Sequence, residues 1–415
     1  MALGNQGSMI LKEDGSVWCS GHYKYNQLGD GASTGTFIFS NTLLNGAKAV
    51  AMTNFHSLVL KQDGTVWTAD QNDNSQLLDG PRADKIYFVQ VFSGGAQAVA
   101  AGLQYSMVLK QDGGMWAMGN NNYGQLGDGT QKSKSRFVKV VSNGVKAVTA
   151  GSLHSMVLKQ DGSLWTTGSN SHGQLGMSLL VKDSAVFGKV IQSGVNAMAA
   201  GALHSLLVKQ DGSVWATGCN VFGQLGDRST VQKNIFTSVF ARGAKAVAAG
   251  HSHSMVLQQD GSVWATGSNL YGQLGDGSKT NRNSFVKVRS SGIKAFAAGF
   301  GHSMILKQDD SVWATGWNSY GQLGDGSLTS TSVFVRVTQL GNSMPHDAVI
   351  LPQNQLHPGI TVTTRVSTTG EKQVKVRFVS RFVKDVLYCC FIIYDSVINW
   401  FHTKPDYSKV FKMGK

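Results

Sequence analysis

Short apolar runs, separated by turns that contain glycine, recur along most of the chain. One unit consists of KAVAAG (residues 245–250), then HSMVLQQDGSVWATGSNLYGQLGDG (residues 253–277), then SFVKV (residues 284–288). No run in the unit follows the 3.6-residue apolar period of an amphipathic helix. An Asp-Gly pair between two apolar runs is typical of a hairpin with a type I′ turn, in which both central residues have positive φ. The pattern therefore predicts four short strands per unit.

The unit occurs seven times with a nearly constant length. Its tryptophans are separated by 49, 49, 49, 50, 49 and 49 residues, and they are Trp18, Trp67, Trp116, Trp165, Trp215, Trp264 and Trp313. A fixed period of this length indicates a solenoid or a propeller. Four short strands per repeat match one blade of a β-propeller, and continuous apolar runs such as MVL are expected where neighbouring blades cover both faces of a sheet. We predict an all-β fold, a seven-bladed β-propeller.

The repeated words GxxHSMVLKQDGSVWATGSNxYGQLGDG resemble the regulator of chromosome condensation repeat. The resemblance extends over about residues 1–337, and it implies a seven-bladed propeller. It implies no single function, because propellers of this family include exchange factors for the small GTPase Ran, accessory domains of ubiquitin ligases, a plant UV-B photoreceptor and bacterial β-lactamase inhibitors. Function has to be argued from individual sites.

The terminal repeats depart from the pattern. The first repeat begins at MALG, so most of its first strand is missing, and it has Gly7 where five repeats have His. The seventh repeat has Asp310 where the glycine of the Asp-Gly turn is expected. Terminal repeats are commonly atypical. The C-terminal segment is a candidate donor of a strand that would complete the ring.

Residues 338–415 lack the repeat and are expected to form an extension beside a propeller domain of residues 1–337. The stretch HPGITVTTRVSTTGEKQVKVRFVSRF alternates like two strands around Gly370, and the apolar run VLYCCFIIYDSVINWF is interrupted by Asp395. This run is too short for a comfortable membrane span. The N-terminus has no basic segment followed by an apolar core, so we predict no secretory signal and an intracellular protein, cytoplasmic or nuclear.

The charge of the chain makes an acidic partner conceivable. There are 37 Lys and Arg against 24 Asp and Glu, a formal net charge of +13. The excess is spread along the chain, which is more typical of a solvated surface than of a nucleic-acid-binding segment. The cysteines show no metal-binding spacing, and reduced thiols are expected. They are Cys19, Cys219, Cys389 and Cys390.

Two repeated residues could suggest a metal site. The histidine position is occupied by Tyr105 and Gly7 in two repeats, and by His56, His154, His204, His253 and His302 in the others. A metal would require several ligands to converge within about 2 Å of one ion, so we interpret these histidines as scaffold whose ring nitrogens satisfy backbone groups. A calcium loop would need several oxygen ligands close in sequence, so a turn or cap role is predicted for Asp30, Asp128, Asp227, Asp276 and Asp325.

The variable loops carry the candidate binding residues. Binding residues concentrate on loops held by a rigid frame, and equal positions within the repeat predict that these loops emerge on one face. The alternative reading of the same residues is a solvated surface. The candidates are Lys132, Lys134, Arg136, Lys139, Arg228, Lys233, Lys279, Arg282, Lys287 and Arg289.

The function predicted is protein–protein interaction. No nucleophile, base and orienting residue occur together, so we predict no enzyme, no cofactor and no metal. The propeller is expected to be a monomer that binds a protein partner, with regulation of, or guanine-nucleotide exchange on, a small GTPase as the specific case. The alternatives are attachment to chromatin or nucleic acid through the basic loops, an inhibitor-type binding module and an accessory domain of a ubiquitin ligase. Binding that falls steeply with salt would favour nucleic acid.

Overall fold

The structure is a computed structural model. It describes residues 1–22, 28–29, 35–42, 44–70, 85–178, 180–337, 360–366 and 372–378. The chain divides into two compact units, Met1–Ser343 and Met344–Lys415.

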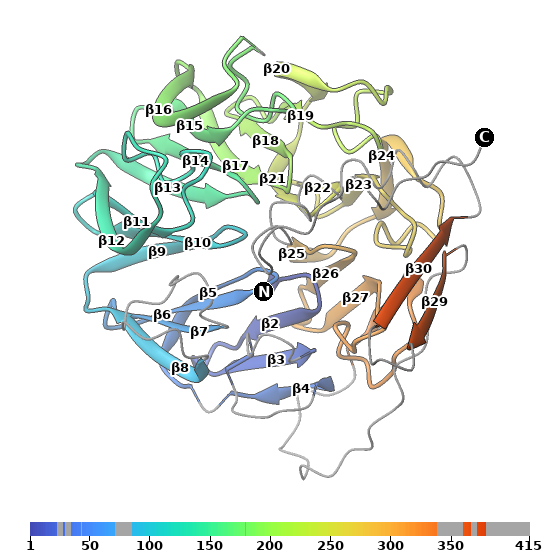
Figure 1. Cartoon of the computed structure of the whole chain (residues 1–415). Coiled ribbons are helices and arrows are strands. Elements are labelled where there is room, and N and C mark those ends of the chain that lie inside the picture. The colour runs from blue at the N-terminus through green and yellow to red at the C-terminus, as the bar shows by residue number, and fades with distance from the viewer. Residues whose placement is uncertain are drawn as a thin grey trace. The chain divides into compact units, whose positions relative to one another are not determined.

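The first unit consists of seven four-stranded antiparallel sheets, numbered here as blades 1 to 7 in chain order. Figure 1 shows them arranged around a common centre, from blue for blade 1 to orange for blade 7. Within each blade the strands follow one another in sequence order, which confirms the predicted propeller of four strands per repeat. The strands are β1 (Ala2–Leu3), β2 (Gly7–Leu11), β3 (Val17–Gly21) and β4 (Thr36–Asn41) in blade 1; β5 (Ala47–Met52), β6 (His56–Lys61), β7 (Val66–Asp70) and β8 (Lys85–Phe92) in blade 2; β9 (Ala96–Ala101), β10 (Tyr105–Lys110), β11 (Met115–Gly119) and β12 (Lys134–Val141) in blade 3; β13 (Val145–Ala150), β14 (His154–Lys159), β15 (Leu164–Ser169) and β16 (Asp183–Ile191) in blade 4; β17 (Val195–Ala200), β18 (His204–Lys209), β19 (Val214–Gly218) and β20 (Lys233–Phe240) in blade 5; β21 (Ala244–Ala249), β22 (His253–Gln258), β23 (Val263–Gly267) and β24 (Arg282–Arg289) in blade 6; and β25 (Ile293–Ala298), β26 (His302–Lys307), β27 (Val312–Gly316) and β28 (Thr331–Arg336) in blade 7.

The first strands of the blades form a closed cycle. Each first strand contacts that of the next blade, in the order β1, β5, β9, β13, β17, β21, β25 and back to β1. Blade 1 takes all four of its strands from residues 2–41, and its first strand is only two residues long. The expectation that the C-terminal segment would donate a strand is therefore wrong for the described strands, because β1, though short, fills that place.

Apolar side chains of adjacent blades form the core between them. Met255 and Val263 of blade 6 pack in one cluster with Ile305 and Phe334 of blade 7. The second and third strands are buried along nearly their whole length, as in β18, where only the last residue is partly exposed. Covering a sheet on both faces explains why these strands read as continuous apolar runs.

The Asp-Gly turns differ from the type I′ hairpins expected from the sequence. In blade 6 the Gly261 amide donates to the Gln258 carbonyl at 3.1 Å, and Gly261 has φ +77° while Asp260 is not at positive φ. This pattern is a type I turn followed by a glycine in the left-handed region. Asp260 Oδ1 accepts the Ser262 amide at 2.8 Å. A left-handed residue is therefore needed at one position, not two.

Among its described residues, the second unit contains one antiparallel hairpin. β29 (Ile360–Val366) pairs with β30 (Lys372–Phe378), which confirms the two strands predicted around Gly370. Residues 379–415, with the apolar run and Cys389 and Cys390, lie outside the described residues.

The described part of the chain contains no helix that is long and apolar enough to cross a membrane.

Candidate functional site

The connections between strands alternate between two ends of each blade. The loop from the third strand to the outer strand carries Gly-Gln-Leu-Gly, and we call it the GQLG loop. Because the strands are antiparallel, this loop lies at the same end of the blade as the link between the first two strands. We call this end the GQLG face. The Asp-Gly turns lie at the opposite end, the Asp-Gly face. The GQLG loops of blades 3 to 7 are residues 120–133, 170–182, 219–232, 268–281 and 317–330.

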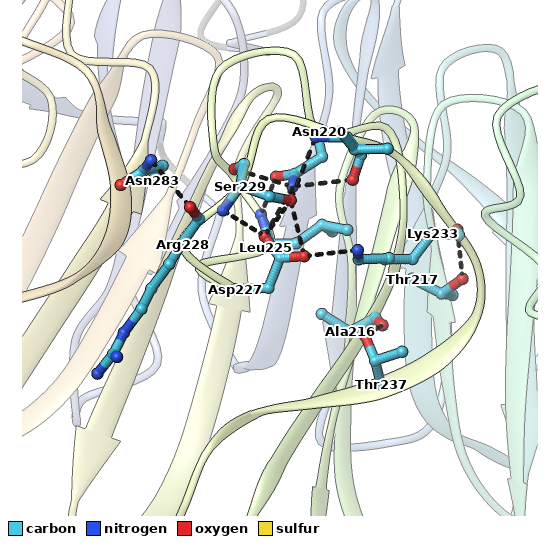
Figure 2. Close-up of polar contacts among 11 residues, drawn as sticks. Ala216, Thr217, Asn220, Leu225, Asp227, Arg228, Ser229, Lys233, Thr237 and Asn283 are labelled. Atoms are coloured by element: carbon cyan, nitrogen blue, oxygen red, sulfur yellow. Dashed lines mark hydrogen bonds and ion pairs between the residues drawn. The ribbon is translucent and has the colours of Figure 1, made fainter.

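An asparagine and an aspartate organise the GQLG loops of blades 3, 5, 6 and 7, as Figure 2 shows for blade 5. Asn220 Nδ2 donates to Asp227 Oδ1 at 2.9 Å, and Asn220 Oδ1 accepts the Leu225 amide at 2.9 Å. Asp227 Oδ1 also accepts the Ser229 amide at 3.0 Å. The predicted cap role of the aspartate is thus confirmed in this blade. The same bonds recur in blades 3, 6 and 7 through Asn121, Asp128, Asn269, Asp276, Asn318 and Asp325, whereas Asp30 lies outside the described residues.

The GQLG loop also reaches the next blade. The Arg228 amide donates to the Asn283 carbonyl at 2.7 Å, so the loop of blade 5 is bonded to the outer strand of blade 6. The last glycine of the motif, Gly226, has φ +77°, and a Cβ there would lie 2.5 Å from the Phe285 ring. This glycine is required both by its backbone conformation and by the close approach of the neighbouring blade.

Three of the ten candidate cations hold their own loops. Lys134 lies 3.0 Å from Asp128, Lys233 lies 3.1 Å from Asp227, and Arg282 lies 2.7 Å from Asp276. Burial alone would raise the pKa of these carboxyls, but the hydrogen bonds of each loop outweigh it and keep the pKa below its ordinary value. These three cations are therefore part of the loop structure.

Three other candidates lie at the opposite face. The Lys287 ammonium is 5.1 Å from the centre of the Trp264 ring, and the Arg289 guanidinium is 4.5 Å from that of Phe334. Lys139 lies opposite Trp116 in the strand pairing of blade 3, as Lys287 lies opposite Trp264 in blade 6. An eight-residue outer strand is about 23 Å long, and it separates these residues from the GQLG loops. The expectation that all the candidate loops emerge on one face is wrong for these three residues. The segments taken as loops in the sequence also contained the outer strand, in which these residues lie.

The remaining four candidates belong to the GQLG side and have exposed side chains. Lys132, Arg228 and Lys279 lie in GQLG loops, and Arg136 lies near the start of β12. No ion pair involving these four side chains is found within the described residues. They remain predicted partner contacts.

A cluster of aromatic side chains on the GQLG face escaped the sequence analysis. Trp317 of blade 7 stacks on Tyr271 of blade 6 at 5.2 Å and 23° between ring planes, and it meets Tyr320 edge-on at 5.2 Å. Phe300 lies 6.2 Å from Trp317, and His22 of blade 1 lies 5.0 Å from Tyr320. The sequence signal was a departure from the repeat, since the other six repeats have a smaller side chain at the position of Trp317, namely His22, Gln71, Asn120, Ser169, Cys219 and Ser268.

The aromatic cluster adjoins a cavity at the propeller axis. The cavity has a volume of about 200 Å³ and is lined by the ends of the first strands of all seven blades. Phe300 and His251 also line it, and their rings lie 4.3 Å apart. The GQLG face therefore combines a central hollow, an aromatic cluster over blades 6, 7 and 1, and exposed cations on blades 3, 5 and 6.

The repeated histidines join neighbouring blades. His253 Nε2 lies 2.9 Å from the Ser303 hydroxyl of the next blade, and that hydroxyl donates its single hydrogen to the Gln273 carbonyl at 2.7 Å. The hydrogen between His253 and Ser303 must therefore reside on Nε2. The equivalent histidine pairs are His56–Ser106, His154–Ser205, His204–Ser254 and His302–Ser8.

This arrangement supports the scaffold interpretation and corrects one detail of it. The histidine partner is a serine side chain, not a backbone group, and Nδ1 of His154, His204, His253 and His302 has no hydrogen-bond partner within the described residues. Burial lowers the pKa of His56 and His154 to about 4, so these rings are neutral at pH 7. In the part of the chain that the structure describes, no group of three or more His, Cys, Asp or Glu side chains could hold a metal ion.

Comparisons with known proteins agree with this geometry. Models of the regulator of chromosome condensation (RCC1) repeat match residues 96–125, 145–174, 195–224, 244–273 and 293–322, and also residues 112–158, 211–257 and 260–306. No curated protein sequence matches the chain.

Among solved structures, similar folds occur in yeast and human proteins. Prp20p from Saccharomyces cerevisiae has a TM-score of 0.65 at 20% identity, covering 74% of this chain and 83% of its own. Yeast RCC1 (Prp20) in a structure with Kap60 has a TM-score of 0.71 at 18% identity, covering 81% and 85%. Human WBSCR16 has a TM-score of 0.67 at 22% identity, covering 75% and 87%. From its repeats and its seven-bladed propeller, this chain belongs to the regulator of chromosome condensation (RCC1) repeat family.

Proposed function

We propose that the propeller binds a protein partner through its GQLG face, with guanine-nucleotide exchange on a small GTPase as the specific case. The observation that carries the proposal is the half-buried Trp317 stacked on Tyr271. Tryptophan, tyrosine and arginine are enriched among the residues that dominate protein interfaces. A large aromatic side chain at a position where the frame accepts a serine serves recognition better than stability.

The comparison with yeast Prp20p supports a protein partner. The crystal structure of Prp20p was described together with its binding properties to Gsp1p and histones. At 20% identity, the similarity to Prp20p supports testing small GTPases as the class of protein partner.

The proposal is tested with a panel of purified small GTPases carrying a fluorescent GDP analogue. We expect a substoichiometric amount of the propeller to accelerate nucleotide release from one of them. Trp317→Ser should reduce this acceleration at least tenfold and keep the melting temperature within about 2 °C, because Ser268 occupies the equivalent position in blade 6.

Two results would count against the proposal. Absence of binding to any nucleotide-free GTPase would exclude the exchange function. An unchanged rate with Trp317→Ser would exclude the GQLG face as the binding surface.

A second candidate function is attachment to chromatin or nucleic acid, and the observation in its favour lies on the other face. Lys48, Lys146 and Lys245 are exposed at equivalent positions near the start of first strands, beside bulges in the pairing. A 20-base-pair duplex tests this candidate. Binding through these lysines should weaken steeply between 50 and 200 mM salt and should be lost when the three are changed to Glu.

A further inference from the structure

Arg228 occupies a backbone position that five of the seven repeats give to glycine and blade 4 gives to Ser178. Its φ is +68°, whereas the equivalent residues of blades 3, 6 and 7 are Gly129, Gly277 and Gly326, with φ between +81° and +85°. A non-glycine residue in the left-handed region is strained and is retained where it has a use. The strain is at the backbone alone, because a Cβ built at Gly277 would meet nothing within 4 Å.

The fold itself makes no use of the Arg228 side chain. Within the part of the chain that the structure describes, Arg228 is bonded to blade 6 only through its own backbone. Its amide donates to the Asn283 carbonyl at 2.7 Å, and its carbonyl accepts from Asn283 Nδ2 at 3.2 Å. Glycine would make both of them. Figure 2 shows the guanidinium directed away from the polar network of the loop. Among the described residues it forms no hydrogen bond or ion pair with a carboxylate.

The charge of Arg228 is uncompensated at the surface. Asp227, the preceding residue in the same loop, and Asp276 in the GQLG loop of blade 6 are neutralised by Lys233 and Arg282. A guanidinium with free donors binds a carboxylate or phosphate in bidentate geometry.

The surroundings favour a protein carboxylate over a nucleic-acid backbone. Val231 in the same loop is 64% exposed, and Ile235 at the start of β20 is 59% exposed. Binding along a phosphate backbone draws on several free cations, but Lys233 and Arg282 at this seam are already engaged. Exposed apolar side chains in the loop of one free arginine and in the strand that follows fit a peptide segment that alternates acidic and apolar residues.

We propose that Arg228 is a partner-binding residue, held at the seam of blades 5 and 6 to bind a carboxylate of an acidic protein segment. This rests on the proposed function, because it assigns the chemistry of the partner on the same face. It places one contact about one blade away from the aromatic cluster that begins at Tyr271 of blade 6.

The chain offers a matched control for the test. Ser178 of blade 4 is the equivalent residue in its own loop, has φ +67°, and donates its amide to the Asn234 carbonyl at 3.1 Å. Arg228→Gly and Ser178→Gly should each raise the melting temperature by about 2 °C, since glycine adopts this conformation without strain. Only Arg228→Gly removes a charge.

Binding is measured by fluorescence anisotropy with a labelled twelve-residue peptide of repeated Glu-Glu-Leu. We expect Arg228→Gly to weaken binding at least threefold, Arg228→Lys to weaken it less, and Ser178→Gly to leave it unchanged. A labelled twelve-nucleotide DNA strand is measured in parallel. Arg242→Gly, which removes an exposed charge from the Asp-Gly face, controls for net charge.

Three results would overturn the proposal. They are no gain in melting temperature with Arg228→Gly, equal loss of peptide binding with Arg242→Gly, or a larger loss for DNA than for the peptide. Each of these can occur while a GTPase still binds in a manner that depends on Trp317. Conversely, if no GTPase bound, the difference in peptide affinity between Arg228→Gly and Ser178→Gly could still be measured.

Discussion

His302 of blade 7 and Ser8 of blade 1 close the ring, with Nε2 and the hydroxyl 2.8 Å apart. Blades 1 and 7 are adjacent in space but lie at the two ends of the repeat array. The Ser20 hydroxyl donates to the Gly321 carbonyl across the same seam at 2.6 Å. The ring is therefore closed by the same histidine–serine bond that joins four other pairs of neighbouring blades, with no strand exchanged between its ends.

Ser8→Ala should lower the stability of the propeller. It removes the acceptor of the His302 Nε2 hydrogen inside a buried seam, which costs about 1–3 kcal/mol. Ser254→Ala removes the same bond between blades 5 and 6 and is the matched control. Urea unfolding should show a similar loss for both, and hydrogen exchange should show loss of protection in β1 and β2 for Ser8→Ala alone. Unchanged protection in β1 and β2 would contradict the role assigned to this bond.

Acid should unfold the propeller through its buried histidines. Burial lowers the pKa of His204, His253 and His302 to about 3, against 6.5 for an unperturbed histidine. Because the unfolded chain binds these protons at a higher pH than the folded chain does, the stabilisation is complete above about pH 6.5 and is lost as the pH falls toward 3. Each histidine contributes up to about 1.4 kcal/mol per pH unit in this window.

This pH dependence is measured by urea unfolding between pH 4 and 7.5. His253→Gln should reduce the number of protons taken up on unfolding by about one. A free energy of unfolding that does not change between pH 7 and 5 would show that the histidines are not held neutral.

Gly114→Ser should stabilise blade 3. The Trp116 indole N–H has no hydrogen-bond partner within the described residues, whereas Trp165 Nε1 donates to the Ser163 hydroxyl at 2.9 Å. Gly114 takes the place of that serine and is not at positive φ. The new bond should contribute about 1 kcal/mol.

Gly114→Ala is the control for this change. A Cβ at position 114 would lie 2.9 Å from Asp112 Oδ1, and both variants share that crowding. Thermal unfolding should place Gly114→Ser above Gly114→Ala, and equal melting temperatures would show that the indole N–H gains nothing from the hydroxyl.

Charge reversal should separate the structural cations from the free ones. Lys233→Glu places a second carboxylate beside Asp227 and should therefore lower the melting temperature. The decrease should exceed that of Lys233→Met, which removes only the ion pair and costs at most about 1 kcal/mol of stability. Lys279→Glu should leave the melting temperature nearly unchanged, because Lys279 is exposed in its loop. The comparison is made by scanning calorimetry at low salt. Equal effects of the two reversals would mean that the ion pair with Asp227 does not hold the loop.

The repeat and its strands could be read from the chain because they depend on neighbouring residues. The spacing of the tryptophans, the apolar runs and the turn glycines are local features, and within a blade each strand pairs with the next one in sequence. The cap role of Asp227 was also predictable, since its partners Asn220 and Ser229 lie within one loop.

Only the tertiary structure decided what these residues meet in the next blade. His253 and Ser303 are 50 positions apart, and nothing in either repeat alone pairs them. Trp317 and Tyr271 likewise come together only where two blades adjoin. The strain at Arg228 depends on a loop that must turn to reach blade 6. The repeat sets the conformation within each blade, whereas contacts between blades depend on how the rigid sheets pack, and those contacts determine which side chains are left free to bind.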